Sequence, residues 1–355
     1  MSADEVFRRE FGTEPTGRAS VPGRVNLIGE HTDYNGGLVL PMPIPFFTHV
    51  SIGPGESDHD EIHSDRFSDT VRVDPGQPKK DHWADYAVGA LQAARSAGWI
   101  SSPQQVAITG NVPDGVGLSS SASLIVAVLK AAAATSGIHP GVEDISRRAQ
   151  AVESSYVGMP CGIMDQMAVA GGVPGKAMLL NTDTLDYRHV AIPSDWHIAV
   201  IHSGVRRSLA EGRYAERRRE CEQAGMQLQA GHLCQLTDAQ KRTAETLEPV
   251  LARRARHAWT EQERVLQSSR AIENHDLEEF GRLLLQGHAS LRDEFEVSVP
   301  KIDTLVQAAV SAGAAGARLT GGGFGGCIVA VMVKEKFDPW RSKLADSSPD
   351  ASVLC

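Results

Sequence analysis

The sequence predicts a protein of two domains, each of which combines strands with helices. Its 355 residues exceed what one hydrophobic core ordinarily organises. Short strand-like segments such as residues 105–109 alternate with helical ones such as 124–129. A Gly/Pro turn and further strands place the domain boundary within residues 175–195. We therefore expect an N-terminal domain over residues 1–180 and a C-terminal domain over residues 190–355.

The composition narrows the class of protein. Apolar residues make up 41% of the chain and charged residues 22%, which is ordinary for a globular protein. A net charge of −9 argues against nucleic acid as a partner, because nucleic acid selects basic surfaces. We expect no membrane partner, since no signal peptide or membrane-length apolar run is visible. Five scattered cysteines without a Cys-x-x-Cys pair indicate reduced thiols, a cytoplasmic location and no zinc site.

The stretch from 113 to 123, PDGVGLSSSAS, carries the strongest chemical signal. It lies between a predicted strand and an alanine-rich predicted helix. Two glycines let backbone N–H groups approach an anion, and a helix N-terminus adds unpaired donors and a positive dipole. The alternative is that the serines only cap the helix. No lysine follows as in a Walker loop, so a polyphosphate here would need backbone dipoles, hydroxyls and a metal.

A predicted strand, loop and strand occupy residues 21–41. The loop places Glu30, His31 and Asp33 within four residues, which gives good acceptors for the hydroxyls of a polyol. The alternatives are a solvated polar turn or a metal site, although the spacing is poor for three ligands on one ion. Arg24 lies mid-strand between apolar residues, and such an arginine requires an anion, either a structural carboxylate or a substrate phosphate.

Three further residues have both a structural and a functional interpretation. Trp83 lies near the start of a helix predicted from Asp81 through Ala97, where it either packs or stacks on a base. Glu153 flanks a buried helical stripe and needs an arginine or a metal as partner. Asp165 lies near another helix start, where it either complements the helix dipole or acts as a general base.

The C-terminal half is mostly helical over residues 205–295 and then turns glycine-rich. Its arginines alternate with glutamates, which predicts a solvated helix face; they are Arg206, Arg207, Arg213, Arg217, Arg218 and Arg219. Gly321, Gly323 and Gly326 satisfy a Gly-x-Gly-x-x-Gly pattern. A dinucleotide site would require a helix after this pattern, but a β-branched strand follows, so the pattern predicts a glycine loop that closes over a ligand.

Four motifs in order resemble those of the galactokinases, within the galactokinase, homoserine kinase, mevalonate kinase and phosphomevalonate kinase superfamily. The first, GRVNLIGEHTDYN at 23–35, is similar to the galactokinase signature itself, and 113–122 is similar to the superfamily's phosphate loop. Residues 161–166 and 319–326 are similar to the third and fourth blocks. The resemblance covers nearly the whole chain. It implies two α+β domains of mixed sheets with helices packed on them, and an active site in the cleft between domains.

The resemblance also implies residue roles. Asp165 would be the catalytic base, and Arg24 would pair with it and stabilise the transferring phosphoryl group. The sugar galactose would contact Glu30, His31, Thr32, Asp33, Gly162 and Tyr214. The phosphates of ATP would lie against Gly115, Val116, Gly117, Leu118, Ser119, Ser120 and Ser121, with Ser64 and Trp83 near ribose and adenine. Mg²⁺ would be held by Ser121 and Glu153. We expect a monomer, with a weak homodimer as the alternative.

The chain departs from the family pattern at two positions. Asp114 puts a carboxylate inside the phosphate loop, and we expect this side chain to point to solvent. Gly36 stands where many relatives carry Asp. The chain is also shorter than usual. Besides a galactokinase, the alternatives are a kinase for another sugar such as N-acetylgalactosamine, a non-catalytic sugar sensor and a nicotinamide-dependent oxidoreductase. The intact serine loop favours catalysis over the sensor.

Overall fold

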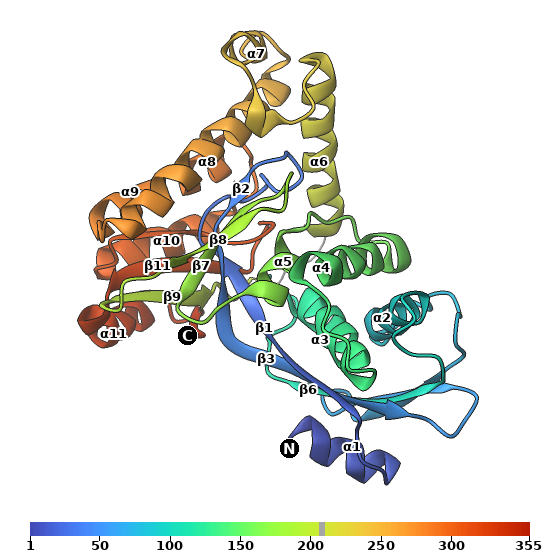
Figure 1. Cartoon of the computed structure of the whole chain (residues 1–355). Coiled ribbons are helices and arrows are strands. Elements are labelled where there is room, and N and C mark those ends of the chain that lie inside the picture. Colours follow the sequence, from blue (N-terminus) through green and yellow to red (C-terminus); the bar gives the residue numbers. More distant parts are fainter. Residues whose placement is uncertain (206–209) are drawn as a thin grey trace. The chain divides into compact units, whose positions relative to one another are not determined.

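The described chain forms two compact units, each assembled from separate stretches of sequence. The structure is a computed structural model that describes residues 1–205 and 210–355 (Figure 1). Unit 1 comprises Met1–Arg24, Pro45–Asp114 and Ser119–Gly172. Unit 2 comprises Val25–Ile44, Gly115–Leu118 and Val173–Cys355. The chain therefore passes between the units several times, and residues 115–118 of the phosphate loop belong to unit 2 while the serines that follow belong to unit 1.

Unit 1 is built on a five-stranded mixed sheet. Its strand order is β1-β3-β6-β4-β5, where the strands are β1 (Gly17–Asn26), β3 (Pro41–Pro54), β4 (Asp60–Ser64), β5 (Asp69–Val73) and β6 (Gln104–Gly110). Neighbours β3 and β6 are antiparallel, whereas β4 and β6 are parallel. The parallel pair brings the ends of β4 and β6 to the same edge, so that Ser64 pairs with Ile108 just before the phosphate loop.

Helices cover both faces of this sheet. Four helices lie on one face and α1 (Ala3–Phe11) lies on the other (Figure 1); the four are α2 (Asp85–Ser96), α3 (Ser120–Thr135), α4 (Val142–Ala151) and α5 (Met164–Gly171). A π-helical turn, Val152–Val157, continues α4. The alanine-rich run of α3 is buried between sheet and helices. The strand predicted at residues 105–109 and the helix predicted at 124–129 are thus confirmed.

The start of α2 differs from the prediction by four residues. The sequence places the helix from Asp81, but α2 begins at Asp85. Asp81 adopts φ = 56°, in the left-handed region, where an L-residue cannot continue a right-handed helix. The buried Asp85 carboxylate accepts the N–H groups of Lys80 and His82, the latter at 2.9 Å, and thereby stabilises the turn that precedes the helix.

Unit 2 contains two antiparallel sheets. The larger has the order β10-β11-β9-β12, with β9 (Trp196–His202), β10 (Gly316–Leu319), β11 (Cys327–Val333) and β12 (Ser352–Val353). The smaller has the order β2-β7-β8, with β2 (Leu38–Val39), β7 (Lys176–Asn181) and β8 (Tyr187–Ala191). The glycine pattern at 321–326 joins β10 to β11, so a strand follows it as predicted.

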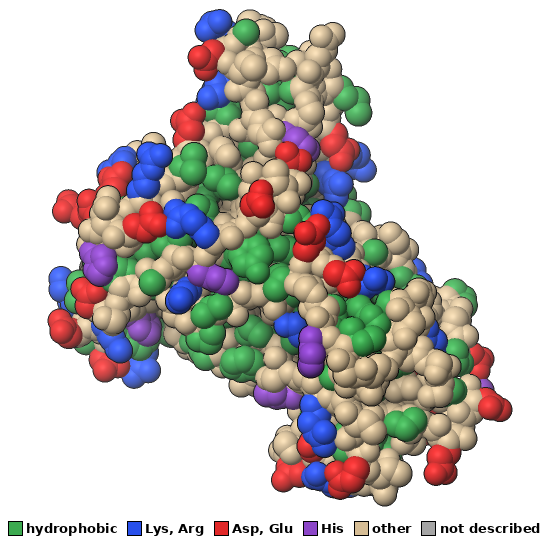
Figure 2. Space-filling model, in the orientation of Figure 1, with side chains coloured by type: hydrophobic (Ala, Val, Ile, Leu, Met, Phe, Trp, Pro, Cys, Tyr) green, Lys and Arg blue, Asp and Glu red, His purple; other side chains and the backbone are tan. Residues whose placement is uncertain are grey.

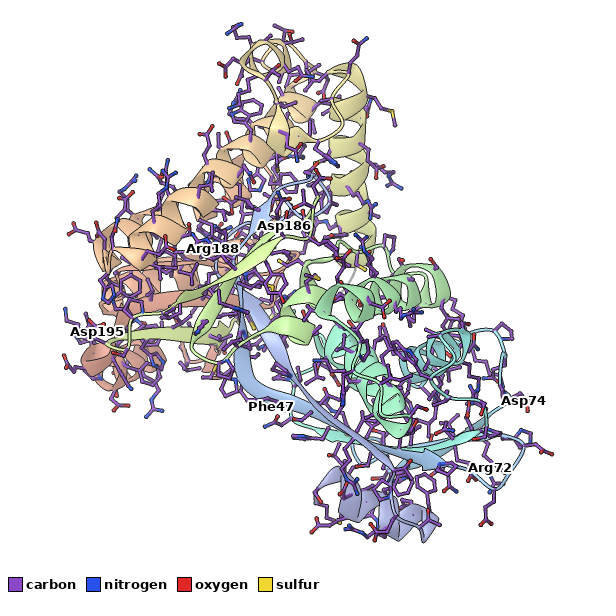
Figure 3. All side chains as sticks on the ribbon, in the orientation of Figure 1. Phe47, Arg72, Asp74, Asp186, Arg188 and Asp195 are labelled. Carbon is purple, nitrogen blue, oxygen red and sulfur yellow. The ribbon has the colours of Figure 1, made fainter. Side chains whose placement is uncertain are left out.

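Six helices accompany these sheets within the described residues of unit 2. They are α6 (Ala210–Gln227), α7 (Asp238–Ala244), α8 (Pro249–Glu273), α9 (Leu277–Asp293), α10 (Pro300–Ala312) and α11 (Phe337–Ser347). Short 3₁₀ turns occupy Leu233–Gln235 and Lys334–Lys336. The long helix α8 packs on α6, α7 and α9 and also on β2 and β8. Arg188 of β8, labelled in Figure 3, forms an ion pair with Glu273 at the end of α8.

One arginine of the predicted solvated face is buried instead. Arg217 on α6 is only 9% exposed, and its Nε donates to the carbonyl of Phe295 at 2.8 Å. The solvated-face prediction is therefore wrong for this residue, because its planar fork satisfies backbone carbonyls that would otherwise be buried without a donor. Arg213 and Arg219 are exposed as predicted. Arg206 and Arg207 lie outside the described residues.

The surface carries no broad basic area on the face drawn in Figure 2, where Lys and Arg are interspersed with Asp and Glu. All five cysteines have free thiols. Across residues 1–205 and 210–355, no helix is both long and apolar enough to cross a bilayer.

Candidate active site

The phosphate loop leads into α3 with the geometry of an anion cradle. Gly115 and Gly117 both have φ in the left-handed region, at 70° and 86°. Ser119 precedes the helix, also left-handed, and its side chain makes no capping hydrogen bond. The capping alternative is therefore wrong for Ser119. The first turn of α3 has no side-chain cap, which leaves its N–H groups and the positive end of its dipole for an anion.

Arg24, Asp165 and Ser119 meet in unit 1. The Arg24 guanidinium donates from Nε at 2.8 Å and from Nη2 at 2.5 Å to Asp165 Oδ1. The Ser119 hydroxyl donates to Asp165 Oδ2 at 2.6 Å. The Arg24 side chain is 5% exposed, whereas that of Asp165 is 30% exposed. Asp165 is thus a fixed carboxylate with one side open, the arrangement that a proton acceptor at a substrate hydroxyl requires.

A second carboxylate of unit 1 lies beside the start of α3. Ser121 donates to Glu153 Oε1 and Gln166 donates to Glu153 Oε2, at 2.6 and 2.7 Å. Burial raises the pKa of Glu153, and the neighbouring Asp165 carboxylate raises it further. Glu153 is in the π-helical turn, whose extra residue per turn re-aims the side chains that follow α4.

These oxygen atoms fit a hard divalent cation. The Gln166 Oε1 atom is buried without a hydrogen-bond partner, so it is able to accept from a metal-bound water. Mg²⁺ sites commonly use one or two protein ligands together with substrate phosphates and water. Among the residues that the structure describes, no group of three or more His, Cys, Asp or Glu side chains converges as a metal site. A Mg²⁺ at Ser121 and Glu153 would therefore depend on the phosphates for its remaining ligands.

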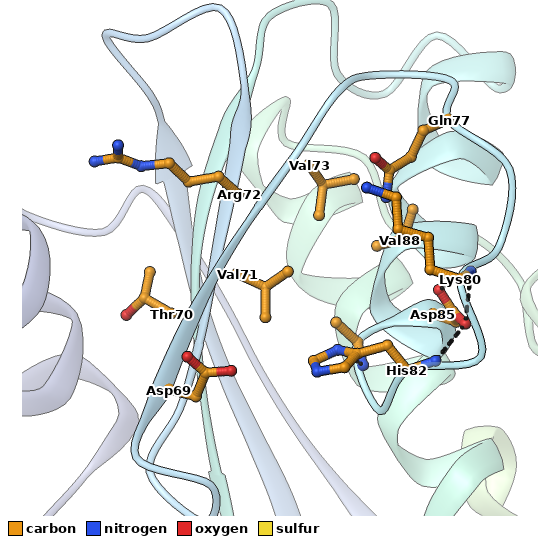
Figure 4. Close-up of a pocket in the computed structure, with 11 residues that line it drawn as sticks. Asp69, Thr70, Val71, Arg72, Val73, Gln77, Lys80, His82, Asp85 and Val88 are labelled. Atoms are coloured by element: carbon orange, nitrogen blue, oxygen red, sulfur yellow. Dashed lines mark hydrogen bonds between the residues drawn. The ribbon is translucent and has the colours of Figure 1, made fainter.

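The two residues predicted near the nucleoside both adjoin the β4–β5 turn. Ser64 ends β4 and is buried. Trp83 is partly exposed and stacks on Phe67, with ring centroids 4.9 Å apart. This supports the packing interpretation for one face of the indole. A pocket of about 430 Å³ opens between β5 and the start of α2, and its lining includes both chain neighbours of Trp83 (Figure 4).

In unit 2, the 29–37 loop folds back on itself and buries its polar groups. The Thr32 hydroxyl donates within the loop, to the carbonyls of Gly29 and Leu38 at 2.8 Å each. Its oxygen therefore contributes to the shape of the loop. His31 has φ = 62°, is 4% exposed, and forms a hydrogen bond through Nδ1 with the Tyr34 hydroxyl at 2.8 Å.

Aromatic rings surround His31. The ring centroids of Tyr214 and Phe295 lie 5.4 and 4.6 Å from that of His31. His31 and Tyr214, both predicted to contact the substrate, are thus brought together. Asp33, also predicted, is half-buried in the same loop. Gly162 is buried and lies two residues before the start of α5 in unit 1.

Glu30 is more deeply buried than a hydroxyl acceptor in an open loop would be. It is 1% exposed, and its Oε2 accepts from Arg318 Nη2 at 2.5 Å. Arg318 also pairs with Glu261 of α8 at 2.7 Å. Neither Arg318 nor Glu261 is among the residues predicted for the site. Arg318 lies in a short strand between apolar residues, so the reasoning applied to Arg24, that such an arginine requires an anion, could have found this site.

Three family signatures match the chain. The galactokinase galactose-binding signature matches residues 5–54. Two domains of the galactokinase, homoserine kinase, mevalonate kinase and phosphomevalonate kinase (GHMP kinase) superfamily also match: the N-terminal domain at residues 85–172 and the C-terminal domain at residues 268–345. A galactokinase of Haemophilus influenzae is 38% identical over 98% of this chain and 93% of its own length. The chain belongs to the galactokinase family. A second galactokinase, from Exiguobacterium sibiricum, is 39% identical over 94% of the chain and 88% of that protein.

Solved structures agree with this membership. The crystal structure of Lactococcus lactis galactokinase complexed with galactose superimposes with a TM-score of 0.92 at 31% identity, covering 99% of this chain and 96% of that one. Mevalonate kinase of Methanococcus jannaschii, at 18% identity and a TM-score of 0.69, covers 95% of this chain and 96% of its own and shares the fold. The predicted galactokinase resemblance, the α+β fold of the GHMP kinases and the kinase class of this galactokinase-family chain are confirmed.

Proposed function

We propose that this chain transfers the γ-phosphoryl group of ATP to the C1 hydroxyl of D-galactose, giving galactose 1-phosphate and ADP. The observation that supports this most strongly is the Asp165 carboxylate, held by Arg24 and Ser119 in a chain of the galactokinase family. A carboxylate accepts the proton of an attacking hydroxyl, and an arginine stabilises negative charge on a phosphoryl group in flight.

The proposed step balances as follows. The C1 hydroxyl loses its proton to Asp165 while its oxygen forms a bond to the γ-phosphorus. The bond between that phosphorus and the bridging oxygen of ADP breaks, and its electron pair leaves with ADP. Arg24 holds Asp165 from one side and offers positive charge as the phosphoryl group transfers. Ser119 fixes the second carboxylate oxygen, so the base enters the reaction already oriented.

We propose that the 29–37 loop recognises the sugar. Asp33 is its half-exposed carboxylate, and a carboxylate takes hydroxyl donors in fixed directions. His31 and Tyr214 contribute ring surface and polar edges. The match of the galactokinase galactose-binding signature to residues 5–54, which include this loop, supports the assignment.

Purified chain with Mg-ATP tests the proposal through ADP release on a panel of D-galactose, glucose, N-acetylgalactosamine, arabinose and mevalonate. We expect turnover with galactose to exceed that with the other compounds at least tenfold. Turnover with N-acetylgalactosamine alone would retain the mechanism and reject the substrate. Binding of both ATP and galactose without ADP release would reject the kinase activity in favour of a sensor.

We propose that Ser121 and Glu153 hold Mg²⁺, which when bound with ATP neutralises charge on the phosphate oxygens. Glu153→Gln keeps the size of the side chain but removes the charge that a cation needs. We expect it to lower kcat at least about 100-fold and to raise the Mg²⁺ concentration required for half-maximal activity. Electron paramagnetic resonance of Mn²⁺ with a non-hydrolysable ATP analogue provides a binding measurement independent of turnover. Glu143→Gln, on the exposed side of α4, is the matched control. Equal Mn²⁺ binding in the two variants would contradict the assignment.

Asp114, the carboxylate inside the phosphate loop, forms an ion pair with Arg66 from the β4–β5 turn. Both side chains are about half exposed, as expected for a carboxylate that points to solvent. We propose that Arg66 neutralises Asp114 and so protects ATP binding. Exposed pairs contribute roughly 0.2–1 kcal/mol, so Arg66→Ala should raise KM for ATP about two- to fivefold. The double variant Arg66→Ala/Asp114→Ala should restore it, while Arg72→Ala on the same hairpin should change nothing. An unchanged KM in Arg66→Ala would reject the role.

A further inference from the structure

A buried group of charged and polar side chains in unit 2 connects α8 and β10 to the 29–37 loop. We call His257, Glu261 and Arg318 the anchoring cluster. Their side chains are 0% exposed. Because they are fully enclosed by protein, none of them can touch a sugar or a nucleotide. Any influence that they have on the reaction must act through the groups they hold.

The anchoring cluster holds the start of the 29–37 loop at its backbone. Glu261 Oε1 accepts the N–H of Gly29 at 2.9 Å. His257 Nε2 lies 3.1 Å from the carbonyl oxygen of Glu30. Burial lowers the pKa of His257 to about 4, so the ring is neutral near pH 7 and its Nε2 carries the proton that this carbonyl accepts. Consecutive backbone groups of the loop are therefore fixed by residues one helical turn apart on α8.

The cluster also holds the Glu30 side chain. Arg318 Nη2 bridges the two carboxylates, at 2.5 Å from Glu30 and 2.7 Å from Glu261. Glu30 Oε1 accepts the N–H of Gly321 at 3.3 Å, which ties the loop to the glycine-rich turn after β10. Gly287 of α9 leaves room for this bridge, because a Cβ there would lie 2.2 Å from Arg318 Nη1. The guanidinium of Arg318 thus packs directly against α9 at Gly287.

The two carboxylates that contact Arg318 have pKa values shifted in opposite directions. Burial raises the pKa of Glu30 to about 7; Arg318 opposes the shift and Glu261 adds to it. The pKa of Glu261 is lowered, because Arg318 and Arg264 together outweigh its burial. Glu261 is therefore the stable anion that keeps Arg318 in place. A buried ion pair adds little net stability compared with apolar side chains, so its contribution here is better sought in geometry than in folding energy.

We propose that the anchoring cluster positions the 29–37 loop and thereby sets affinity for the sugar and discrimination among sugars, without contacting the substrate. The inference rests on the proposed sugar-binding role of this loop. A displacement of about 1 Å in a positioning group costs on the order of 100-fold in rate or affinity, so loss of the cluster should be visible in sugar kinetics. ATP affinity should be unaffected, because the cluster holds only parts of the 29–37 loop and the glycine-rich turn.

Glu261→Gln is the main test, since it retains size and an acceptor for Gly29 but removes the charge that holds Arg318. We expect KM for galactose to rise ten- to 100-fold, KM for ATP to stay within twofold, and the kcat/KM ratio of galactose to glucose to fall. Asp60→Asn is the matched control. Asp60, like Glu261, is a buried acid that pairs with arginine and accepts a backbone N–H; its partners are Arg95 and the N–H of Gln104, and it lies in unit 1 at the start of β4. It should lower the melting temperature and leave KM for galactose unchanged.

His257→Leu is the second variant, in case Glu261→Gln folds poorly. It removes the donor to the Glu30 carbonyl together with the hydrogen bond between His257 Nδ1 and the Ser290 hydroxyl, and we expect a three- to tenfold rise in KM for galactose. His257→Gln keeps an N–H donor and should restore part of the loss. Equal KM for galactose in wild type and in whichever loop variant folds, or equal rises in both Michaelis constants, would overturn the inference. Absence of galactose turnover in the wild type would instead reject the proposed function.

Discussion

Asp165→Asn is expected to lower kcat by about 10²–10⁴-fold while leaving the KM values for ATP and galactose within a few-fold of wild type. Asparagine has the same shape: its oxygen can still accept from Arg24, and its NH2 group can donate to the Ser119 hydroxyl, so the side chain stays in place. What it cannot do is take the proton of the attacking hydroxyl. The loss therefore falls on the chemical step, and steady-state kinetics with a coupled ADP assay measures it.

Asp144→Asn is the matched control for this prediction. Asp144 is an acid in the first turn of α4, where its side chain is 49% exposed and pairs with Arg148. We expect its kinetics to equal those of the wild type. Turnover of Asp165→Asn within threefold of wild type, from protein with an unchanged melting temperature, would show that the hydroxyl loses its proton elsewhere.

Arg24→Ala is expected to lower kcat by roughly 10³-fold or more, the range that an arginine at a transferring phosphoryl group supplies. The Arg24 side chain is 5% exposed, and two of its guanidinium nitrogens donate to Asp165, which places its charge beside the proposed base. Removing Arg24 also leaves the carboxylate without its cation. Arg24→Lys keeps the charge but loses the two-pronged geometry, so we expect it to recover only a small part of the rate.

Added guanidinium tests the Arg24 prediction directly. If the missing cation is the cause, millimolar guanidinium should restore part of the turnover of Arg24→Ala but none of that of Asp165→Asn. Arg148→Ala, on α4, should behave as wild type with and without guanidinium. Rates in Arg24→Ala within tenfold of wild type would contradict the assignment.

The sequence predicts the chemistry of unit 1 better than that of unit 2. Arg24 in an apolar strand required an anion, the family resemblance implied Asp165, and the two are paired in the structure. Glu153 was expected to need an arginine or a metal; the resemblance placed Ser121 beside it, and the two side chains form a hydrogen bond. Such inferences succeed because a buried charge has few ways to be satisfied, and the choices are visible in the residue types.

In unit 2, the burial of the 29–37 loop and its contacts with distant residues are not predicted by the sequence. Glu30 and His31 are predicted as acceptors for the hydroxyls of a polyol, with a solvated turn as the alternative. They are 1% and 4% exposed, which excludes the solvated turn for them, and they contact residues more than 180 positions away, Arg318 and Tyr214. Nothing in the local spacing of the loop indicates which distant helix covers it. Glu261 is likewise not evident from the sequence of α8, because it is one of three glutamates in that helix and nothing in their spacing marks it as the inward one.

The position of the phosphate in the product tests the central proposal most directly. Phosphorus-31 nuclear magnetic resonance of a reaction with Mg-ATP and D-galactose should show a new phosphomonoester coupled to the anomeric proton, formed in equal amount with ADP. Asp165→Asn should not form it on the same time scale. A phosphoryl group at another carbon, or inorganic phosphate in its place, would contradict transfer to the C1 hydroxyl.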